Sequence, residues 1–329
     1  MKKNEQFLLP QEKVRRANQR LLKTGCVACL AIACVFTVQN LMPLDFYINP
    51  GIDENTKFVV AHACGGMNVD GKTKKYLNVV EGVDYHYAHG TRMFEVDFAF
   101  SKEGELVGTH KYEYLKGYGN NNRIGIEEYN NALILDRFHG ITSQRLFELI
   151  QKYPDAKFII DTKESDPYLI YEKLIDDANS FGVDLSGSIL PFVSSKNMLE
   201  RLEAAYDFEE IMFTNYKAKL NTNELLKIVE AHDKINYLHI FPTDFSRIEI
   251  NEFNKRGIRV FAHMDNGPFH VALNYGCTGI FSDDITEDAF NVKYRYVLDQ
   301  KLIDGGNSKG NAQASLDEML GITFSDQIF

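Results

Sequence analysis

The sequence has few cysteines outside one short stretch. Only five of its 329 residues are cysteine, and Cys26, Cys29 and Cys34 all lie in an apolar run near the N-terminus. Cys64 and Cys277 are far apart in the chain, so they do not form the framework of a disulfide-rich domain. Neither their spacing nor their neighbours suggest zinc. Disulfide-stapled and zinc-module classes are therefore excluded.

An excess of positive charge is also lacking outside the first residues. The formal net charge is −10, while residues 1–23 hold seven lysines and arginines against two glutamates, so the rest of the chain carries −15. Such an acidic body argues against a nucleic-acid-binding surface. With 44% hydrophobic and 12% aromatic residues, the composition is typical of a globular protein with a sizeable core.

Residues 24–44 predict a transmembrane anchor. Thr24–Val38 has no charged residue and the stretch continues to Leu44, which reaches the roughly 20 residues needed to cross a bilayer. The basic segment 1–23 precedes it, so the N-terminus is expected in the cytoplasm and the body outside. A cleaved signal peptide and a lipoprotein signal at Cys34 are the alternatives. The long preamble, the missing A-x-A site and the apolar residues after Cys34 favour an uncleaved anchor.

A strand, a turn and a return strand are predicted over Arg92–His110. Apolar residues at even positions from 94 to 100 alternate with Glu95 and Asp97, which is the period of a β-strand. Side chains two residues apart share a face, so the two carboxylates project together. Ser101–Glu105 has turn chemistry, and the return strand leads to His110. An edge strand with a solvated acidic face is the alternative interpretation.

Strand and helix patterns alternate over the rest of the body. The other expected strands are Phe58–Ala61, Lys157–Asp161, Ser188–Val193, Ile211–Thr214, Tyr237–Phe241, Ile258–Met264 and Gly279–Ser282. The expected helices are Tyr76–His89, Ser143–Tyr153, Pro167–Phe181, Lys196–Tyr206, Asn221–His232, Ile248–Arg256 and Phe269–Tyr275. This alternation predicts parallel strands joined by right-handed crossovers. Nine strand candidates exceed the eight of a (β/α)₈ barrel, and the return strand is the surplus one.

We therefore expect an α/β protein with one TIM-barrel domain. The barrel would span residues 58–300, after a polar linker at 45–57, and would carry an irregular, tyrosine-rich insertion at 111–140. Residues 301–329 would form a flexible C-terminal tail, because they contain the segment DGGNSKGNAQAS.

Polar residues are expected to gather at the carboxyl ends of the barrel strands, where the active site of this fold lies. They are His62, Glu95, Asp97, His110, Asp161, Lys163, His263 and Asn266. Three converging carboxylates repel one another unless a divalent cation is bound, and oxygen ligands favour Ca²⁺ or Mg²⁺ over zinc. Two histidines can supply an acid and a base near neutral pH. Lys163 adds positive charge for an anionic transition state, so the set predicts a phosphodiesterase site.

The ordered motifs resemble the glycerophosphodiester phosphodiesterase family, over about residues 58–290. They are Ala61-His-x-x-Gly-Gly66, Tyr76-Leu-Asn78, Gly90-x-Arg-x-x-Glu95-x-Asp97, Gly104-x-x-Val-x-x-His110, Asp161-Thr-Lys163 and Gly276-x-x-Gly-Ile-Phe-Ser-Asp283. The resemblance implies a TIM barrel. It also implies that His62 and His110 are the acid–base pair, and that Glu95, Asp97 and Asp161 bind the metal.

Three positions depart from the family pattern. The family usually has His-Arg-Gly at the first strand, where the arginine contacts phosphate, whereas Ala63 follows His62 here. Lys111 replaces the usual acidic residue after the second histidine, and 262–266 (AHMDN) replaces a Trp-Thr-x-Asn strand. These changes leave the acid–base pair and the carboxylates in place. They fall on groups that would contact substrate.

The expected activity is metal-assisted hydrolysis of a glycerophosphodiester-type bond. The substrate could be a glycerophosphodiester, a phospholipid headgroup or a phosphodiester polymer outside the membrane. Attack by the substrate's own adjacent hydroxyl would form a cyclic phosphate first, and a lyase-like phospholipase would stop there. A tethered barrel that binds a phosphorylated polymer without catalysis is the other alternative, against which the retained histidines argue.

Overall fold

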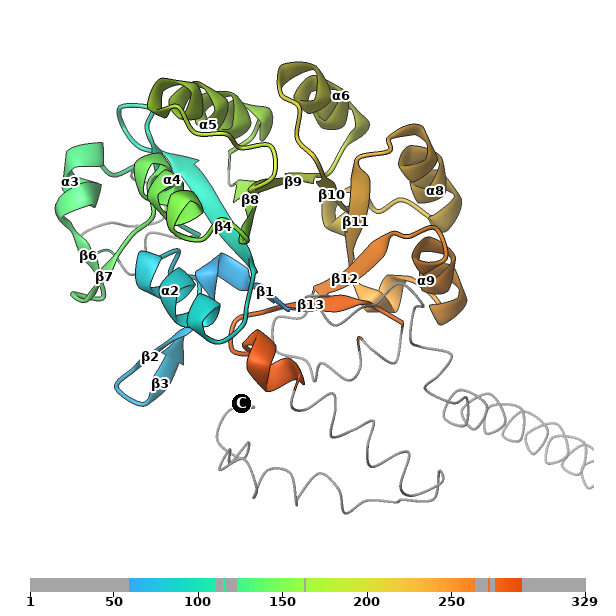
Figure 1. Ribbon diagram of the computed structural model, residues 1–329, viewed down its shortest axis with the longest axis horizontal. Helices are drawn as coiled ribbons and strands as arrows, with labels where there is room; N and C mark the ends of the chain where they lie inside the picture. Colours follow the sequence, from blue (N-terminus) through green and yellow to red (C-terminus); the bar gives the residue numbers. More distant parts are fainter. Residues whose placement is uncertain are drawn as a thin grey trace, which may run out of the picture.

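Eight parallel strands close into a barrel in the computed structural model, which describes residues 59–110, 115, 123–162, 164–263, 272 and 276–291 (Figure 1). The strands are β1 (Val59–Ala61), β4 (Met93–Phe100), β8 (Lys157–Thr162), β9 (Ile189–Val193), β10 (Ile211–Thr214), β11 (Ile235–Ile240), β12 (Arg259–His263) and β13 (Gly279–Ser282). The first strand, β1, pairs in parallel with both β4 and β13, which closes the sheet. The predicted TIM-barrel architecture is confirmed.

Helices surround this barrel (Figure 1). They are α2 (Val80–Ala88), α4 (Ser143–Lys152), α5 (Tyr168–Phe181), α6 (Lys196–Ala205), α7 (Asn215–Ala218), α8 (Thr222–Ala231) and α9 (Arg247–Asn254). Side-chain caps fix several of their starts. Asn221 and Ser246 form capping boxes with Glu224 and Glu249, at the beginnings of α8 and α9. Such caps satisfy backbone N–H groups that a helix leaves free in its first turn.

The barrel interior is filled by an apolar layer to which every barrel strand contributes one buried side chain. The layer consists of Val60, Met93, Ile159, Leu190, Met212, Tyr237, Phe261 and Phe281. The alternate residues of the same strands, such as Val96 and Ile160, pack outward in the core beneath the helices. The strands are therefore buried on both faces, as parallel strands usually are. The alternative that residues 92–100 form a solvated edge strand is wrong.

The surplus strand is the return strand of the central hairpin, as expected. β5 (Leu106–Gly108) runs antiparallel to β4 and pairs with its last three residues. The helix predicted from Tyr76 begins only at Val80. The reason is that Tyr76 and Asn78 have φ of 59° and 51°, in the left-handed region that an α-helix excludes.

The prediction that 111–140 is irregular is wrong for its described part. This part contains α3 (Ile126–Asn131) and a hairpin of β6 (Leu133–Ile134) and β7 (Phe138–His139). A second small core holds them, with Tyr129 buried among Leu77, Val79 and Val107. The sequence analysis also missed a hairpin of β2 (Met67–Val69) and β3 (Lys72–Lys74).

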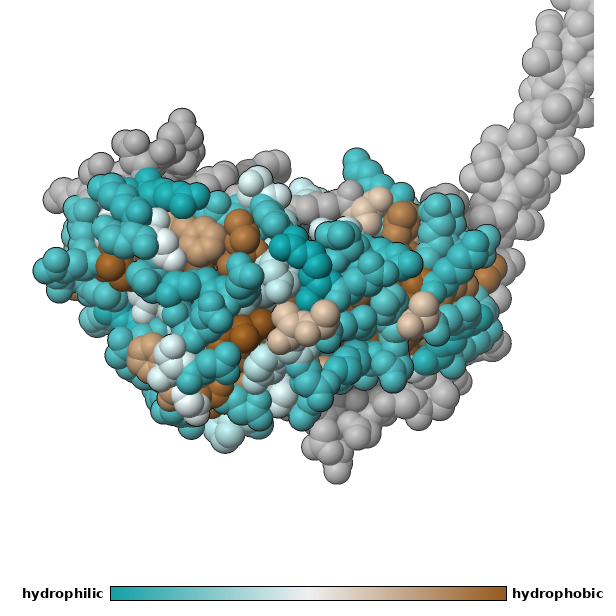
Figure 2. All heavy atoms as spheres, turned by 90° about the horizontal axis from the view of Figure 1, so that it is seen from above, coloured by the Kyte–Doolittle hydropathy of each residue, from teal (hydrophilic) through white to brown (hydrophobic). Residues whose placement is uncertain are grey.

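Several predicted segments lie outside the described residues. These are the basic segment 1–23, the anchor 24–44, the linker 45–57, the tail 301–329 and, apart from Ala272, the helix Phe269–Tyr275. In the part of the chain that the structure describes, no helix has the length and apolarity needed to span a bilayer. Hydrophilic side chains predominate on the face shown in Figure 2, and the hydrophobic ones there are scattered.

Candidate active site and metal centre

A second layer of side chains lies on the apolar layer, toward the carboxyl ends of the strands. Successive residues of a strand point to opposite faces, so the residue two beyond each apolar-layer residue also faces the interior. These residues are His62, Glu95, Asp161, Phe192, Thr214, His239, His263 and Asp283. All but one are polar, and the second layer therefore marks the candidate active site at the barrel mouth.

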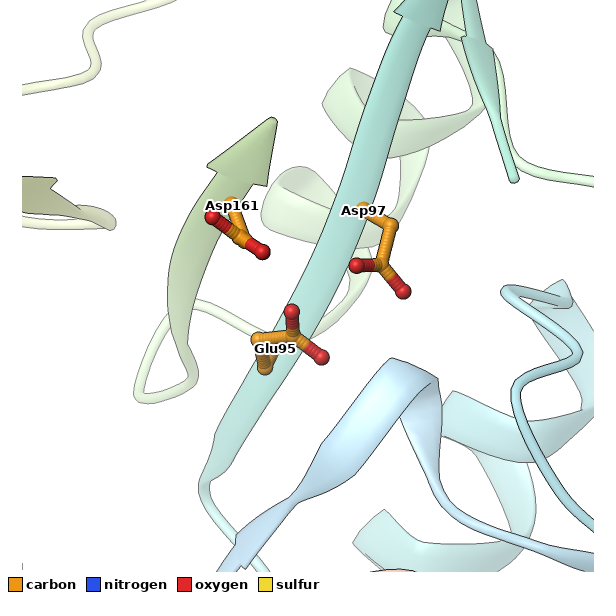
Figure 3. A group of neighbouring side chains, drawn as sticks. All are labelled: Glu95, Asp97 and Asp161. Atoms are coloured by element: carbon orange, nitrogen blue, oxygen red, sulfur yellow. The ribbon is translucent and has the colours of Figure 1, made fainter. Parts of the chain in front are cut away.

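Three carboxylates from β4 and β8 converge at this mouth of the barrel (Figure 3). Glu95, Asp97 and Asp161 each offer an oxygen, and these oxygens all lie within 4.8 Å of one another. Glu95 and Asp97 are buried, with 3% and 0% of their surfaces exposed. Burial of like charges this close is costly without a cation. The donor set therefore fits the hard, oxygen-preferring cation predicted from the sequence, Ca²⁺ or Mg²⁺.

Neighbouring residues hold these carboxylates by hydrogen bonds. The backbone N–H of Ala63 donates to Glu95 Oε2 at 2.6 Å. The Asn78 side chain donates to Asp97 Oδ2 at 3.0 Å and accepts from the Asp97 backbone N–H at 2.8 Å. Ala63 has a φ of 46°, so the turn after β1 places its N–H toward Glu95 in a conformation that L-residues rarely adopt.

His62 lies between the three clustered carboxylates and Asp283, which directly follows β13. Its Nδ1 lies 2.9 Å from Asp283 Oδ1, and its Nε2 lies 3.9 Å from Glu95 Oε2. Burial lowers the pKa of His62, but the charge of Glu95 and the hydrogen bond to Asp283 outweigh it and raise that pKa to about 9. A divalent cation on the carboxylates would oppose this rise, because it would repel the imidazolium.

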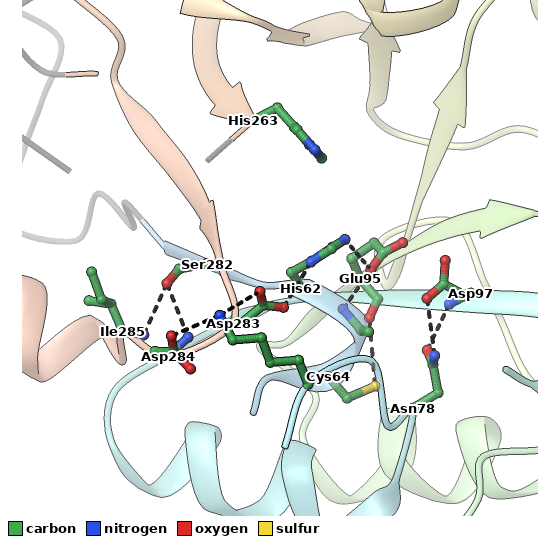
Figure 4. Close-up of polar contacts among 12 residues, drawn as sticks. His62, Cys64, Asn78, Glu95, Asp97, His263, Ser282, Asp283, Asp284 and Ile285 are labelled. Atoms are coloured by element: carbon green, nitrogen blue, oxygen red, sulfur yellow. Dashed lines mark hydrogen bonds and ion pairs between the residues drawn. The ribbon is translucent and has the colours of Figure 1, made fainter. Parts of the chain in front are cut away.

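Asp283 is itself fixed by cationic and backbone contacts (Figure 4). Lys75 Nζ lies 3.4 Å from Asp283 Oδ2 and 3.1 Å from Asp284 Oδ2. The Ser282 hydroxyl accepts from the backbone N–H groups of Asp284 and Ile285 and so closes the turn after β13. Lys75 therefore holds the carboxylate that orients His62, and Ser282 fixes the turn that carries it.

His110 reaches the same site through the return strand. The backbone N–H of Thr109 donates to the Asp97 carbonyl at 2.8 Å, and the Tyr129 hydroxyl donates to the Gly108 carbonyl at 2.6 Å. The ring of Tyr76 contacts both candidate histidines, with centroid distances of 5.2 Å to His62 and 4.5 Å to His110. The structure thus places both histidines against one tyrosine ring.

The remaining site predictions have different outcomes. The structure places His263 at the end of β12, with its ring centroid 6.0 Å from that of His62 (Figure 4). Lys163 and Asn266 lie outside the described residues. The sequence analysis assigned no role to Tyr76, Asn78 or Asp283, although each lies in a motif that it quoted. It did not single out His239 at all.

The fold of this barrel is similar to that of several solved phosphodiesterase structures. A glycerophosphodiester phosphodiesterase from Agrobacterium tumefaciens is 19% identical, with a TM-score of 0.53 over 73% of this chain and 100% of that one. One from Thermotoga maritima is 17% identical, with a TM-score of 0.54 over 73% and 99%. The chain shares the fold of these phosphodiesterases.

A third structure carries a bound product. It is an Oleispira antarctica phosphodiesterase in complex with sn-glycerol-3-phosphate, 16% identical, with a TM-score of 0.56 over 72% of this chain and 96% of that one. No protein-family model and no curated protein matches the sequence. The solved structures therefore come from the family that the sequence motifs resemble, and at these identities the likeness concerns the fold.

Proposed function

We propose that this protein is a metal-dependent phosphodiesterase that hydrolyses a glycerophosphodiester-type bond. The observation that carries the proposal is the meeting of Glu95, Asp97 and Asp161 within 4.8 Å beside two histidines that contact the same Tyr76 ring. Metal-binding carboxylates and an acid–base pair at one barrel mouth are the two parts that such a reaction needs. The fold shared with the phosphodiesterases supports the proposal.

Glu95, Asp97 and Asp161 would hold Ca²⁺ or Mg²⁺. When bound, such a cation polarises a phosphate oxygen and lowers the pKa of a neighbouring hydroxyl or water. The chain's own contribution is to hold the carboxylates at fixed positions. Ala63 and Asn78 do so through hydrogen bonds to Glu95 and Asp97, and partners of this kind tune metal sites strongly.

His62 and His110 would exchange protons with the reacting groups. One takes the proton of the attacking hydroxyl or water, and the other protonates the leaving alkoxide; each role is worth about 10²–10⁴-fold. The hydrogen bond between Asp283 and His62 Nδ1 directs the other ring nitrogen, Nε2, toward the carboxylate cluster. Asp283 would thereby orient His62 in the way a carboxylate orients a catalytic histidine.

Phosphate binding would fall to Lys163, His263 and Asn266. The side chain of Ala63 is buried and cannot supply the cation that the family pattern has at that position. The product bound by the Oleispira antarctica enzyme, sn-glycerol-3-phosphate, supports a glycerophosphodiester, a phospholipid headgroup or a phosphodiester polymer as substrate.

The test is the release of alcohol from a panel of glycerophosphodiesters with and without Mg²⁺ or Ca²⁺. Turnover should require a divalent cation and should disappear in Glu95→Gln. Glu252→Gln on α9, whose partners are Lys255 and Arg256, is the matched control. A cyclic phosphate as the only product would establish the lyase-like reaction. Binding of a phosphorylated polymer without turnover would instead support the alternative of a tethered barrel that binds such a polymer without catalysis.

We also propose the domain order and location predicted from the sequence. Residues 1–23 would lie in the cytoplasm, 24–44 would anchor the protein as a single membrane span, and 45–57 would link it to an extracytoplasmic barrel of residues 58–300, followed by the tail 301–329. Protease added to intact cells should digest the body and spare residues 1–23. A body protected until lysis would reverse the orientation, and a mature N-terminus beyond residue 38 would indicate a cleaved signal.

A further inference from the structure

The ring of Tyr76 lies against both histidines of the proposed acid–base pair. It meets the His110 ring at an angle of 31° with the centroids 4.5 Å apart, and the His62 ring at 82° and 5.2 Å. The first arrangement is close to stacking and the second is edge-to-face, and aromatic pairs favour both. One half-buried side chain thus touches two imidazoles that follow different strands, β5 and β1.

The backbone of Tyr76 adopts a conformation that tyrosine rarely has. Its φ is 59°, in the left-handed region, where a bulky residue is an outlier and glycine, asparagine or aspartate is the usual choice. Such a residue stores strain that its surroundings must offset. A turn alone would favour a smaller side chain, so the contacts of the tyrosine ring with the two histidines are what offsets the strain.

The residues on either side tie Tyr76 to the site. Before it, Lys75 Nζ lies 3.4 Å from Asp283 Oδ2. After it, the backbone N–H of Asn78 donates to the Ala63 carbonyl at 3.1 Å, and the Asn78 side chain bonds to one of the three clustered carboxylates. The Tyr76 ring is therefore carried by a short segment that is held at both of its ends.

The reaction proposed above needs a support of this kind. In an in-line displacement the attacking and leaving oxygens lie on opposite sides of the phosphorus, so the acid and the base must each reach one of them. His110 follows a strand of only three residues, β5. Packing against its ring adds to what fixes its side-chain torsions, which otherwise have several low-energy values.

We propose that Tyr76 is a positioning residue, whose ring sets the orientation of the His62 and His110 imidazoles for the two proton transfers of one turnover. In this proposal the ring touches neither the substrate nor the cation. The inference rests on the proposed function for what the histidines do. The packing of the three rings is a property of the protein alone, so it can be tested without substrate.

The first experiment observes the packing in the absence of substrate. A proton over the face of an aromatic ring is shifted upfield by the ring current, so protein labelled with ¹³C-histidine should give upfield imidazole resonances for His110. Tyr76→Leu should return them toward ordinary values and should also move the His62 resonances. Tyr76→Phe, which keeps the ring, should do neither. Ordinary His110 resonances in the wild type, or unchanged spectra in Tyr76→Leu, would overturn the proposal.

Tyr85→Leu is the matched control for this experiment. Tyr85 on α2 also contacts two histidine rings, those of His86 and His89, with centroid distances of 5.3 Å and 4.3 Å. Its replacement should move the resonances of these two histidines only, and should leave kcat at the wild-type value.

The second experiment measures kcat and KM separately. Tyr76→Leu should lower kcat about 10–100-fold, because catalytic groups that are misplaced by about 1 Å lose rate on this scale. KM should change little, since the ring is assigned no contact with substrate. Tyr76→Asn, which removes the ring but tolerates a left-handed φ, should show the same loss without added backbone strain. Tyr76→Phe should recover most of the activity.

Three kinetic results would overturn the proposal. A higher KM with unchanged kcat would make Tyr76 a substrate contact, and a Tyr76→Phe variant as slow as Tyr76→Leu would assign the role to the hydroxyl. Wild-type turnover in Tyr76→Asn would show that the ring is not needed. A wild-type protein without turnover on any phosphodiester would instead refute the proposed function, while the histidine spectra would still decide whether the ring holds both imidazoles.

Discussion

Asn78 and Asp97 exchange two hydrogen bonds inside the barrel mouth. The Asn78 amide donates to the Asp97 carboxylate at 3.0 Å, and its oxygen accepts from the Asp97 backbone N–H at 2.8 Å. Both residues are fully buried. Asn78 can make this exchange because it adopts a φ of 51°, which asparagine tolerates better than most residues. One side chain thus fixes both the strand and the carboxylate that would bind the metal.

Asn78→Ala should therefore weaken both the fold and the metal site. Two buried groups of Asp97 would lose partners, which costs about 1–3 kcal/mol in the free energy of unfolding. The affinity for Mg²⁺ or Ca²⁺ should fall about 10–100-fold, as for other residues that support metal ligands. Chemical unfolding and calorimetric titration of the cation measure the two effects. Asn68→Ala is the control, because Asn68 makes a comparable bond, to the Gly71 N–H, in the exposed β2–β3 hairpin.

Neutralising a carboxylate of the cluster should separate activity from stability. Glu95→Gln or Asp97→Asn should abolish turnover, and should also abolish the rise in Tm that we expect for the wild type when a divalent cation is added. In the absence of cation the variants should be as stable as the wild type or slightly more so, because repulsion among the carboxylates is relieved. Turnover that survives both substitutions, or that exhaustive chelation leaves undiminished, would refute the metal assignment.

The two candidate histidines should behave as one unit. His62→Ala and His110→Ala should each lower kcat by about 10²–10⁴-fold, and the double variant should lose far less than the product of the two losses. A nitrophenyl phosphodiester, whose leaving group needs little protonation, should rescue whichever variant lacks the acid. His139→Ala is a suitable control, since His139 is exposed and paired with Glu81. Near-normal turnover in either single variant would refute the assignment of His62 and His110 as the acid–base pair.

His86 should make the fold less stable in mild acid. It lies under the turn after β1, with Nε2 3.3 Å from the Gly66 carbonyl, and burial lowers its pKa from 6.5 to about 4. Between these values the unfolded chain binds a proton that the folded chain does not, so stability falls as pH falls. The His86 contribution is fully present above pH 6.5 and is lost on acidification toward pH 4, in total about 3 kcal/mol.

The measurement for His86 is the free energy of unfolding at pH 7 and pH 5 in the wild type and in His86→Gln. The wild type should lose more stability than the variant over this interval. Equal losses in both proteins would show that other groups account for the pH dependence.

The barrel and much of its mouth could be predicted from the sequence because parallel strands leave a strong pattern. Short apolar runs separated by amphipathic helices fix the strand order, and residues at strand ends must gather at one edge. This reasoning identified the carboxylates Glu95, Asp97 and Asp161, which the structure brings together. It also identified His62 and His110, whose rings both contact Tyr76 in the structure.

His239 could not be singled out in the same way. In a strand buried on both faces, apolar residues occupy inward and outward positions alike, so the sequence pattern does not show which alternate residues face the barrel interior. The structure shows this for β11, because Tyr237 belongs to the apolar layer inside the barrel. His239 then follows two residues later, as Asp283 follows Phe281.

The region after the central hairpin was unpredictable for a different reason. Its short elements are held by contacts with residues distant in sequence, such as Tyr129 with Gly108 and Ile141 with Asn78. Local propensity carries little information about such pairs. The left-handed conformations of Tyr76 and Asn78, which shorten the helix expected there, likewise leave no periodic pattern in the sequence.

The apolar layer in the barrel interior also limits how a substrate can approach. Eight side chains, one from each barrel strand, close the interior below the carboxylates and histidines, so the mouth has no exit on its other side. The products of the proposed hydrolysis, an alcohol and a phosphomonoester, would leave by the opening through which the substrate entered. A long phosphodiester polymer could not be threaded through the barrel and cleaved as it passed. It would have to lie across the rim or insert one end, which makes the ends and bends of such a polymer the points of attack.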